Sequence, residues 1–311
     1  MKIINKVMVT GGLGFIGSHI VNRYLSKGCD VVILDSEEET SNRKRIKWDD
    51  NVTLISERIE DVDISTLPKV DIVINSAAET HVDYSFTRPM DFIKANIIGL
   101  HNLVKFCILH DIPILHLSTD EVIGTGADLY EDSMLRPTNP YSFTKAAGEN
   151  LLHAYGYCEN LNWNIVRLNN TYGKMQFPDK LIPKFIYHIE DGENLPLQGS
   201  GEQTRNFLHV DDFVDAVELV IDEGENKNIY NVSTDEEYSV IEISNMICSV
   251  MGVNFDDVVV QVKDRPFNDP WYHSKNYKLV KLGWKPKRKL KKYLPELVDW
   301  YINNRNMLLV G

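Results

Sequence analysis

The 311-residue sequence predicts an α/β fold, with a doubly wound parallel sheet followed by a smaller α/β domain. Its first half alternates short runs of β-branched residues with longer segments whose apolar residues recur about every 3.6 positions. Strands and helices in alternation form parallel sheets whose two faces are both covered by helices. After Thr171, prolines and glycines divide the chain into shorter elements. We therefore expect a first domain over residues 1–172 and a second over residues 173–311, with some segments of the second returning to the first.

Individual elements follow from these patterns. Six segments have the length and composition of buried strands: Lys6–Thr10, Val31–Leu34, Val52–Ile55, Ile72–Asn75, Ile114–Ser118 and Trp163–Leu168. Three longer segments have the apolar spacing of helices: Phe15–Lys27, Phe92–His110 and Tyr141–Tyr157.

Composition and charge limit the possible partners. The hydrophobic fraction of 43% and the charged fraction of 25% are typical of globular proteins. A net charge of −12 opposes nucleic acid or an anionic membrane as the main partner. The four cysteines lie far apart without metal-ligand spacing, which predicts free thiols in a reducing compartment and no metal site. Without an apparent signal peptide or an apolar run near the ~18 residues that span a bilayer, we expect a cytoplasmic protein.

A glycine-rich turn joins the first strand to the first helix. Gly11 suits the tight turn, Gly14 lets the backbone approach a pyrophosphate, and Gly17 allows close packing of helix and strand. Phe15 and Ile16 begin the helix, whose free N–H groups and positive dipole end attract phosphates. This strand–turn–helix arrangement is the dinucleotide-binding signature of a Rossmann domain.

The second predicted strand is followed by a carboxylate at Asp35, 24 residues after Gly11. A carboxylate in that position binds the adenosine ribose hydroxyls and repels a 2′-phosphate. The sequence therefore predicts NAD, rather than NADP, as the cofactor.

Two clusters carry candidate chemistry. Tyr141 and Lys145 are one helical turn apart, so the ammonium group can lower the pKa of the phenol and let it act as a base. Thr119, Asp120 and Glu121 directly follow the fifth strand. Ligands of open α/β sheets lie outside the carboxyl ends of the strands, so both clusters are expected at one site.

Together these motifs resemble the extended short-chain dehydrogenase/reductase family, and within it the nucleotide-sugar 4,6-dehydratases. The likeness covers nearly the whole chain in the expected order. Besides the two clusters, the matching segments are TGGLGFIGS (10–18), NSAAETHVD (75–83), RLNNTYGKMQFPDKLIP (167–183), GSGEQTRNFLHVDD (199–212), DRPFNDPWY (264–272) and LGWKP (282–286). The sequence DRPFND resembles the corresponding segment of UDP-glucose enzymes of rhamnose synthesis more than that of dTDP-glucose enzymes.

The resemblance implies a role for each residue of the clusters. Tyr141, assisted by Lys145 and Thr119, takes the proton of the hydroxyl at sugar carbon 4 while NAD oxidises that carbon. Glu121 removes the hydrogen at carbon 5, and Asp120 donates a proton to the hydroxyl leaving carbon 6. The two adjacent carboxyls must therefore hold different protonation states, which burial and mutual repulsion supply.

Binding roles are implied as well. Ala77 and Ala78 belong to the cofactor site, and the second domain binds the nucleotide sugar. Arg205 and Arg265 are expected on the diphosphate, because guanidinium groups bind phosphate in a bidentate manner. Contacts to sugar, phosphate or base are expected from His81, Asn170, Lys180, Asn231 and Asn268. We expect Asn96 to bind backbone or water near Lys145.

Three positions depart from the family pattern. Arg58 stands where an aspartate usually binds adenine; arginine cannot accept from the adenine amino group, so stacking or Glu57 would replace the contact. Ile123 replaces a tyrosine that commonly follows the Thr-Asp-Glu cluster. Leu13 replaces a frequent alanine without expected consequence.

Several interpretations stay open at this stage. UDP-glucose and dTDP-glucose differ by one methyl and one hydroxyl, which a few pocket contacts decide. UDP-sugar 4-epimerases and UDP-glucuronate decarboxylases share the Tyr-Lys pair but have no need of the adjacent acid and base. A non-catalytic NAD-sensing scaffold would need none of the five residues together. The resemblance also implies a homodimer, formed through the helices 96–110 and 141–157.

Overall fold

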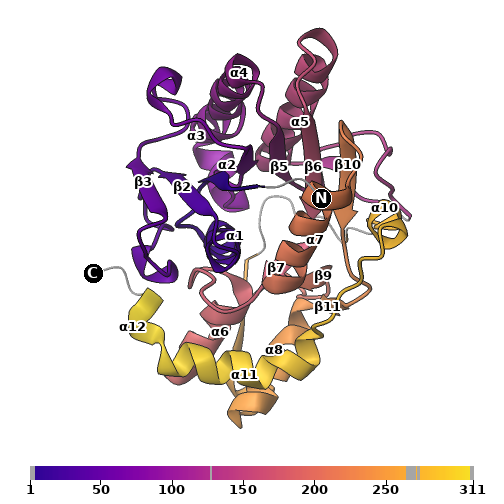
Figure 1. Cartoon of the computed structure of the whole chain (residues 1–311). Coiled ribbons are helices and arrows are strands. Elements are labelled where there is room, and N and C mark those ends of the chain that lie inside the picture. Colours follow the sequence, from indigo (N-terminus) through magenta and orange to yellow (C-terminus); the bar gives the residue numbers. More distant parts are fainter. Residues whose placement is uncertain (1–3, 127, 264–270, 272–273, 309–311) are drawn as a thin grey trace.

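The computed structural model describes residues 4–126, 128–263, 271 and 274–308. A parallel seven-stranded sheet, ordered β10-β6-β5-β4-β1-β2-β3, forms its centre (Figure 1). The strands are β1 (Lys6–Thr10), β2 (Asp30–Asp35), β3 (Val52–Ser56), β4 (Ile72–Asn75), β5 (Ile114–Thr119), β6 (Trp163–Leu168) and β10 (Asn228–Val232). All six predicted strands are confirmed, each within one residue at either end. The order is that of a doubly wound sheet with one added strand.

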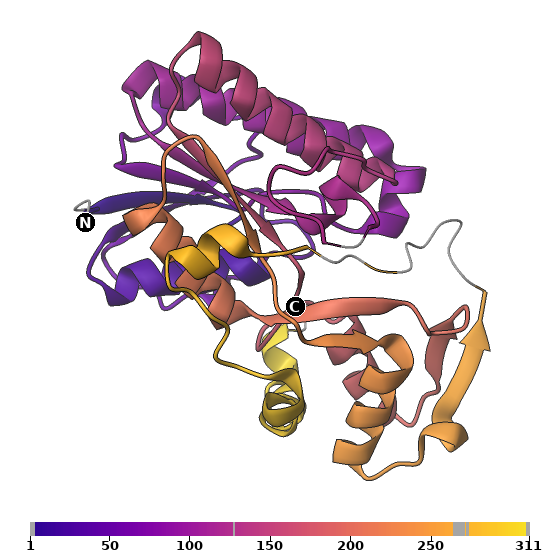
Figure 2. The same cartoon turned by 90° about the vertical axis from the view of Figure 1, so that its right-hand side faces the viewer.

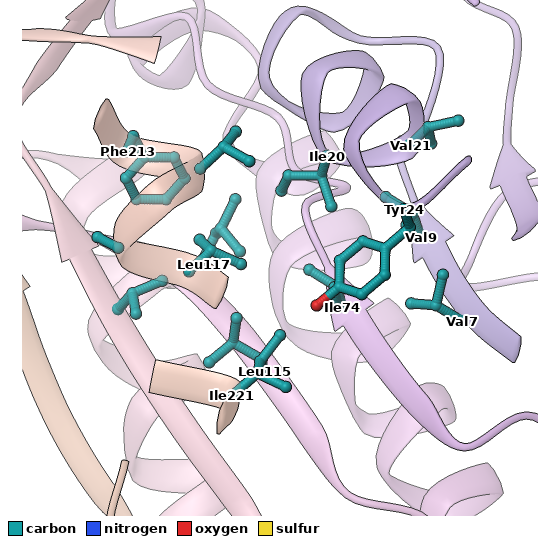
Figure 3. Close-up of a cluster of buried hydrophobic side chains, with 14 of the residues drawn as sticks. Val7, Val9, Ile20, Val21, Tyr24, Ile74, Leu115, Leu117, Phe213 and Ile221 are labelled. Atoms are coloured by element: carbon teal, nitrogen blue, oxygen red, sulfur yellow. The ribbon is translucent and has the colours of Figure 1, made fainter. Parts of the chain in front are cut away.

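Helices cover both faces of this sheet, as the edge-on view shows (Figure 2). One face packs against α1 (Phe15–Ser26) and α7 (Val210–Glu223). Figure 3 shows the core between them, where Ile20 of α1 and Phe213 of α7 lie over aliphatic side chains of the strands. The other face packs against α4 (Leu100–His110) and α5 (Pro140–Cys158). Because both faces are buried, the central strands are apolar throughout instead of alternating.

The predicted helix 92–110 is continuous but irregular. It comprises α3 (Pro89–Ile93), a π-helical turn over 94–99 and then α4. By length and composition, Pro89–His110 could cross a membrane, although half of its most apolar window is buried inside the protein. This segment therefore packs on the large sheet with one side and exposes apolar residues on the other.

The second half of the chain forms a smaller α/β layer beside the carboxyl ends of the strands. Its helices α6 (Leu181–Glu190), α8 (Val240–Met251) and α11 (Leu290–Asn303) share one core. Its strands form two small sheets: β11-β9-β7, of β7 (Asn170–Tyr172), β9 (Thr204–His209) and β11 (Glu237–Ser239), and β12-β8, of β8 (Leu195–Gln198) and β12 (Val259–Val262). Short helices complete the chain: α2 (Val82–Thr87), α9 (Phe255–Val258), α10 (Tyr277–Lys281) and α12 (Arg305–Leu308).

The two halves are not separate along the chain. Helix α7 and strand β10 both follow residue 172, yet both lie on the large sheet. The far end of the chain also returns to the first half, since the Asn42 amide donates to the Met307 carbonyl at 2.6 Å. A linear boundary at residue 172 therefore separates the sequence patterns but not two independent units.

A buried ion pair lies behind α5. Arg167 of β6 binds Glu149 of α5 through two hydrogen bonds of 2.9 and 2.7 Å, and both side chains are almost fully buried. Ser118 of β5 donates to the same carboxylate at 2.6 Å. The pair therefore fixes the helix that carries Tyr141 and Lys145 against two strands.

We predict that Arg167→Met lowers the free energy of unfolding by about 3–5 kcal/mol, because Glu149 is left as an uncompensated buried charge. The double variant Arg167→Met/Glu149→Leu should recover most of this loss. The exposed pair of Arg305 with Asp191 provides the control, since Arg305→Ala should cost less than about 1 kcal/mol. Urea unfolding measures all three, and equal losses for the single and double variants would contradict the prediction.

Candidate active site

A cleft of about 1050 Å³ lies between the large sheet and the second half of the chain. It runs along the carboxyl ends of the strands, where an open α/β sheet binds its ligands. Most of the residues that the sequence indicated line it: Gly11, Gly14, Phe15, Ile16, Gly17, Asp35, Ala77, Ala78, His81, Thr119, Glu121, Tyr141, Lys145, Asn170, Lys180 and Arg205.

The glycine turn has the geometry that a dinucleotide requires. Gly11 has a positive φ of 63°, and a Cβ on Gly17 would come within 2.1 Å of the Gly11 carbonyl oxygen. Helix α1 begins directly after Gly14 and presents its free N–H groups to the cleft. The turn therefore leaves a cradle of backbone donors that fits a pyrophosphate.

Asp35 ends β2 and lies 4% exposed at the edge of this cradle. One of its oxygens accepts from the Leu13 amide at 2.9 Å, and the other accepts from Glu37 N at 2.9 Å and Ser41 Oγ at 2.6 Å. A carboxylate offers about four acceptor positions. Asp35 therefore both holds the glycine turn and keeps capacity for a ribose hydroxyl.

Next to Asp35, the cleft wall differs from the family pattern. Arg58 hydrogen-bonds to Glu38 and, at 3.1 Å, to Glu60. All three line the cleft, as does Glu57. The adenosine end is therefore built around a guanidinium group held by carboxylates.

The catalytic candidates converge at the end of β5. Asp120 and Glu121 begin a single 3-10 turn, whose Thr119 cap accepts a 3.3 Å hydrogen bond from the Glu121 amide. Asn139 caps α5 and donates to Glu121 Oε2 at 2.9 Å. The capping amide therefore joins the start of α5, and with it Tyr141, to one of the two carboxylates.

The two carboxylates have different surroundings. Asp120 is 4% exposed, whereas Glu121 is only partly buried and faces the cleft. Burial, reinforced by the neighbouring Glu121 carboxylate, raises the pKa of Asp120 to about 7. Hydrogen bonds from Asn169 and Thr119 and the charge of Arg205 oppose the rise. Asp120 can therefore carry a proton near neutral pH beside an acceptor carboxylate.

The Tyr-Lys pair does not behave as its spacing predicted. Burial raises the pKa of the Tyr141 phenol, Glu121 adds to the rise, and a hydrogen bond with Thr119 opposes it. Lys145 donates to the Leu117 carbonyl at 2.6 Å, and burial lowers the pKa of its ammonium to about 8. Burial is the largest of the influences on Tyr141, so the pKa of its phenol lies above its usual value, opposite to the direction predicted from the spacing.

Asn96 supports this region from the π-helical turn. Its side chain bonds to the backbone N–H and C=O of Glu79 at 2.9 and 3.0 Å, and donates to Thr144 Oγ1 at 2.9 Å. Thr144 precedes Lys145 on α5. The expected backbone contact near Lys145 is confirmed, and it fixes the loop after β4 against the catalytic helix.

The candidate substrate residues separate into two groups. His81, Asn170, Lys180 and Arg205 line the cleft. Asn231 does not: it is fully buried in β10, and its amide donates to the Lys275 carbonyl at 2.9 Å. The structure thus gives Asn231 a packing position, because β10 joins the large sheet instead of facing the cleft.

Two of the expected binding residues, Arg265 and Asn268, lie outside the described residues. The sequence missed Asn139 and Asn169 as site residues. The Asn139-Pro-Tyr sequence is a helix-start signal that could have indicated the first. Asn169 stands in the matching segment 167–183, but its contact with Asp120 was not visible because the two residues lie 49 positions apart.

The raised pKa of Asp120 has a consequence for stability. A carboxyl whose pKa is near 4 when unfolded and about 7 when folded costs stability as pH rises from about 4 to about 7. Asp120→Asn removes this cost. We predict that its stabilising effect in urea unfolding is greater at pH 8 than at pH 5 by about 2–3 kcal/mol.

The exposed Asp191, whose pKa Arg305 lowers, is the control. Asp191→Asn should show no such gain at higher pH. An equal effect of Asp120→Asn at both pH values would contradict the assignment of a raised pKa.

Comparison with known proteins gives a consistent family. The chain is 38% identical to a trifunctional UDP-glucose 4,6-dehydratase/UDP-4-keto-6-deoxy-D-glucose 3,5-epimerase/UDP-4-keto-L-rhamnose-reductase of Arabidopsis thaliana, over 96% of this chain and 47% of that protein. It thus spans about half the length of that relative. It is 35% identical to the dTDP-D-glucose 4,6-dehydratase of Homo sapiens, over 96% of this chain and 90% of the other.

Among solved structures, a dTDP-glucose 4,6-dehydratase of Streptomyces venezuelae with NAD bound has a TM-score of 0.91 and 32% identity. The similarity covers 97% of this chain and 98% of that one. Residues 7–233 match the NAD dependent epimerase/dehydratase family. This chain therefore belongs to the NAD dependent epimerase/dehydratase family.

Proposed function

We propose that this protein is an NAD-dependent 4,6-dehydratase, a hydro-lyase that converts a nucleoside-diphosphate glucose to its 4-keto-6-deoxy derivative. The observation that carries the proposal is the pair Asp120 and Glu121, one buried with a raised pKa and the other open to the cleft beside Tyr141. An elimination of water needs one acid and one base at adjacent carbons, which this pair supplies. The named 4,6-dehydratases among the relatives support it.

The chain's own groups fit NAD. The glycine turn and the start of α1 would hold the pyrophosphate, and Asp35 the ribose. When bound, NAD would supply a positively charged acceptor for the hydride of carbon 4, and its reduced form would return that hydride to carbon 6. Such a charge near Tyr141 would counter the effect of burial on the phenol.

Tyr141 has the role of moving the proton of the carbon-4 hydroxyl. Its phenol is 9% exposed at the cleft wall, and Thr119 hydrogen-bonds to it. Lys145 lies one turn further along α5, held by the Leu117 carbonyl. The lowered pKa of Lys145, about 8, lets this side chain give up or take a proton near neutral pH.

Glu121 and Asp120 then divide the elimination. A ketone at carbon 4 acidifies the hydrogen on carbon 5, and the Glu121 carboxylate is the group that faces the cleft to remove it. Asn139 orients that carboxylate through Oε2. Asp120, protonated because it is buried, gives its proton to the hydroxyl leaving carbon 6.

UDP-glucose is the proposed substrate, as a precursor of rhamnose or another deoxysugar. The 38% identity to the Arabidopsis UDP-glucose enzyme exceeds the 35% to the human dTDP-glucose enzyme. Within this proposal, dTDP-glucose is the alternative, favoured by the structural similarity to the Streptomyces enzyme.

Two other activities are weaker. Epimerases share the fold, as the 25% identical UDP-glucose 4-epimerase of Thermotoga maritima does. Like UDP-glucuronate decarboxylases, they use no acid-base pair for elimination, so Asp120 and Glu121 count against both. A non-catalytic scaffold that only senses NAD would have no need of a buried Asp120 with a raised pKa. Binding of NAD without turnover of any sugar nucleotide would favour such a scaffold.

We predict that the protein removes one water from UDP-glucose without added NADPH, with a higher kcat/KM than for dTDP-glucose. Mass spectrometry measures the loss of water from each substrate. Glu121→Gln should lower kcat by about 10²–10⁴-fold, because an amide cannot remove the carbon-5 proton. A faster reaction with dTDP-glucose would support the dehydratase activity and overturn the choice of UDP-glucose as the substrate. Absence of water loss from both, with NAD bound, would overturn the dehydratase assignment.

We also propose a cytoplasmic homodimer. Helices α4 and α5 lie side by side on one face of the large sheet (Figure 1). Large apolar side chains are exposed on these helices and on the turns that lead into α4: Met90, Ile98 and Leu109 before and on α4, and Phe143 and Tyr157 on α5. Tyr157 is 95% exposed, which a second copy would relieve. All four cysteines are free thiols, which suits a reducing compartment.

We predict that the wild-type protein has close to twice the 35.7 kDa chain mass in light scattering. The double variant Ile98→Glu/Leu109→Glu should be monomeric, because it places charges in the apolar face. Ile302→Glu changes a residue of α11, away from this face, and should leave the mass unchanged. A wild-type mass of one chain would overturn the dimer.

A further inference from the structure

We propose that Asn169 is a positioning residue for the general acid: its amide occupies Oδ2 of Asp120 and thereby leaves the transferable proton on Oδ1. The inference rests on the proposed dehydratase function. It concerns a residue inside the matching segment 167–183 to which the sequence analysis gave no role.

Asn169 lies directly after β6, facing the start of the 3-10 turn after β5. Its Nδ2 donates to Asp120 Oδ2 at 2.6 Å, a hydrogen bond buried from solvent. The same Nδ2 donates its second hydrogen to Ser274 Oγ at 3.2 Å. The amide nitrogen is therefore fully used, with one hydrogen committed to the acid.

The orientation of this amide is fixed by chemistry. Asn169 Oδ1 accepts from the Thr234 backbone N–H at 3.1 Å, and a backbone N–H can only donate. A flipped amide would set two donors against each other at that position. Hence Nδ2 must face Asp120, and it too can only donate.

This donor determines which carboxyl oxygen carries the proton. A hydroxyl on Oδ2 would point its hydrogen at an N–H group only 2.6 Å from the oxygen, so protonated Asp120 must be protonated on Oδ1. Thr119 Oγ1 donates to Oδ1 at 3.3 Å, but a hydroxyl, unlike an amide N–H, can rotate and accept a hydrogen bond when Oδ1 is protonated. Thr119 also lines the cleft. The proton is thus held on the oxygen that contacts a cleft-lining hydroxyl.

Other charged groups near Asp120 do not make this choice. Glu121 on the same turn disfavours the ionised form, and Arg205 of β9 favours it. Tyr141 of α5 faces Asp120 as a neutral phenol, since its own pKa is raised. These groups influence whether Asp120 is protonated, whereas Asn169 selects the oxygen.

Asn169 also links the acid to the second half of the chain. Thr234 follows β10, and Ser274 follows the segment 264–272 that matches the family's closing motif. The acid is therefore placed by contacts from both halves of the chain. A change in their relative position would be transmitted to Asp120 through one side chain.

The test measures how the intermediate divides between two fates in D₂O. Glu121 removes the carbon-5 proton; the resulting carbanion either expels water, when Asp120 gives its proton to the leaving hydroxyl, or takes a deuteron back. We predict that Asn169→Leu lowers kcat by about tenfold or more with little change in KM. The ratio of carbon-5-deuterated substrate recovered to water-loss product should rise by a similar factor.

The alkaline limb of the pH–kcat profile should also move up by about one unit in Asn169→Leu, because the lost donor stabilised ionised Asp120. Asn169→Ser keeps a hydroxyl donor and should fall between wild type and Asn169→Leu in all readouts, which maintains the test if Asn169→Leu is unstable. Ser274→Ala should act in the same direction but less. Asn276→Ala is the matched control, since this amide bonds to the Ser233 carbonyl and should leave the ratio unchanged.

A raised KM with kcat and deuterium ratio retained would overturn the proposal, because it would mean that Asn169 contacts substrate directly. Unchanged values in folded Asn169→Leu, or the same changes in Asn276→Ala, would overturn it as well. If wild-type protein neither exchanges nor eliminates, the proposed function itself fails. The two failures are therefore distinct.

Discussion

The burial of one carboxyl group beside another imposes the main constraint on this structure. Asp120 is nearly inaccessible, and its neighbour in sequence, Glu121, repels its ionised form. A group of this kind is costly in a folded protein unless hydrogen bonds satisfy it or it stays protonated. Two side-chain amides contribute such hydrogen bonds, one to each carboxyl: Asn169 donates to Asp120, and Asn139 donates to Glu121. The different roles of the two carboxyls therefore follow from different degrees of burial, with each held by its own amide.

The large sheet makes this arrangement possible because it brings together residues distant in sequence. The 3-10 turn continues β5, Asn169 follows β6, and β5 and β6 are adjacent parallel strands in register from Ile114 with Trp163 to Thr119 with Leu168. Side chains that leave two neighbouring strands at the same edge meet without any further loop. Helix α5 is fixed to the same two strands by the Arg167–Glu149 pair and Ser118. Acid, base and phenol thus share one rigid frame, as pre-organised chemistry requires.

Much of this was predictable from the sequence, for local reasons. The glycine turn, Asp35 and the clusters at 119–121 and 141–145 are short motifs whose spacing along one strand or helix already fixes their geometry. The contacts of Asn139 and Asn169 join separate elements, so they depend on strand order and on the exact end of β6. Asn231 was misplaced because nothing in its neighbourhood shows that β10 joins the large sheet. The direction of the Tyr141 pKa also required the structure, since the spacing to Lys145 does not reveal the burial that is the largest influence on this phenol.

The linkage through Asn169 gives a physical reason for the interleaved chain. If the second half were an independent domain, its motion relative to the sheet could change the substrate position without affecting the acid. Here β10 pairs in the large sheet and α7 packs on it, while Thr234 and Ser274 both bond to Asn169. Asn169, which itself lines the cleft, therefore contacts Asp120 as well as Thr234 and Ser274. In the proposed reaction, the contacts of Asn169 with Thr234 and Ser274 keep the proton of Asp120 on one oxygen, which ties proton transfer to the assembled cleft.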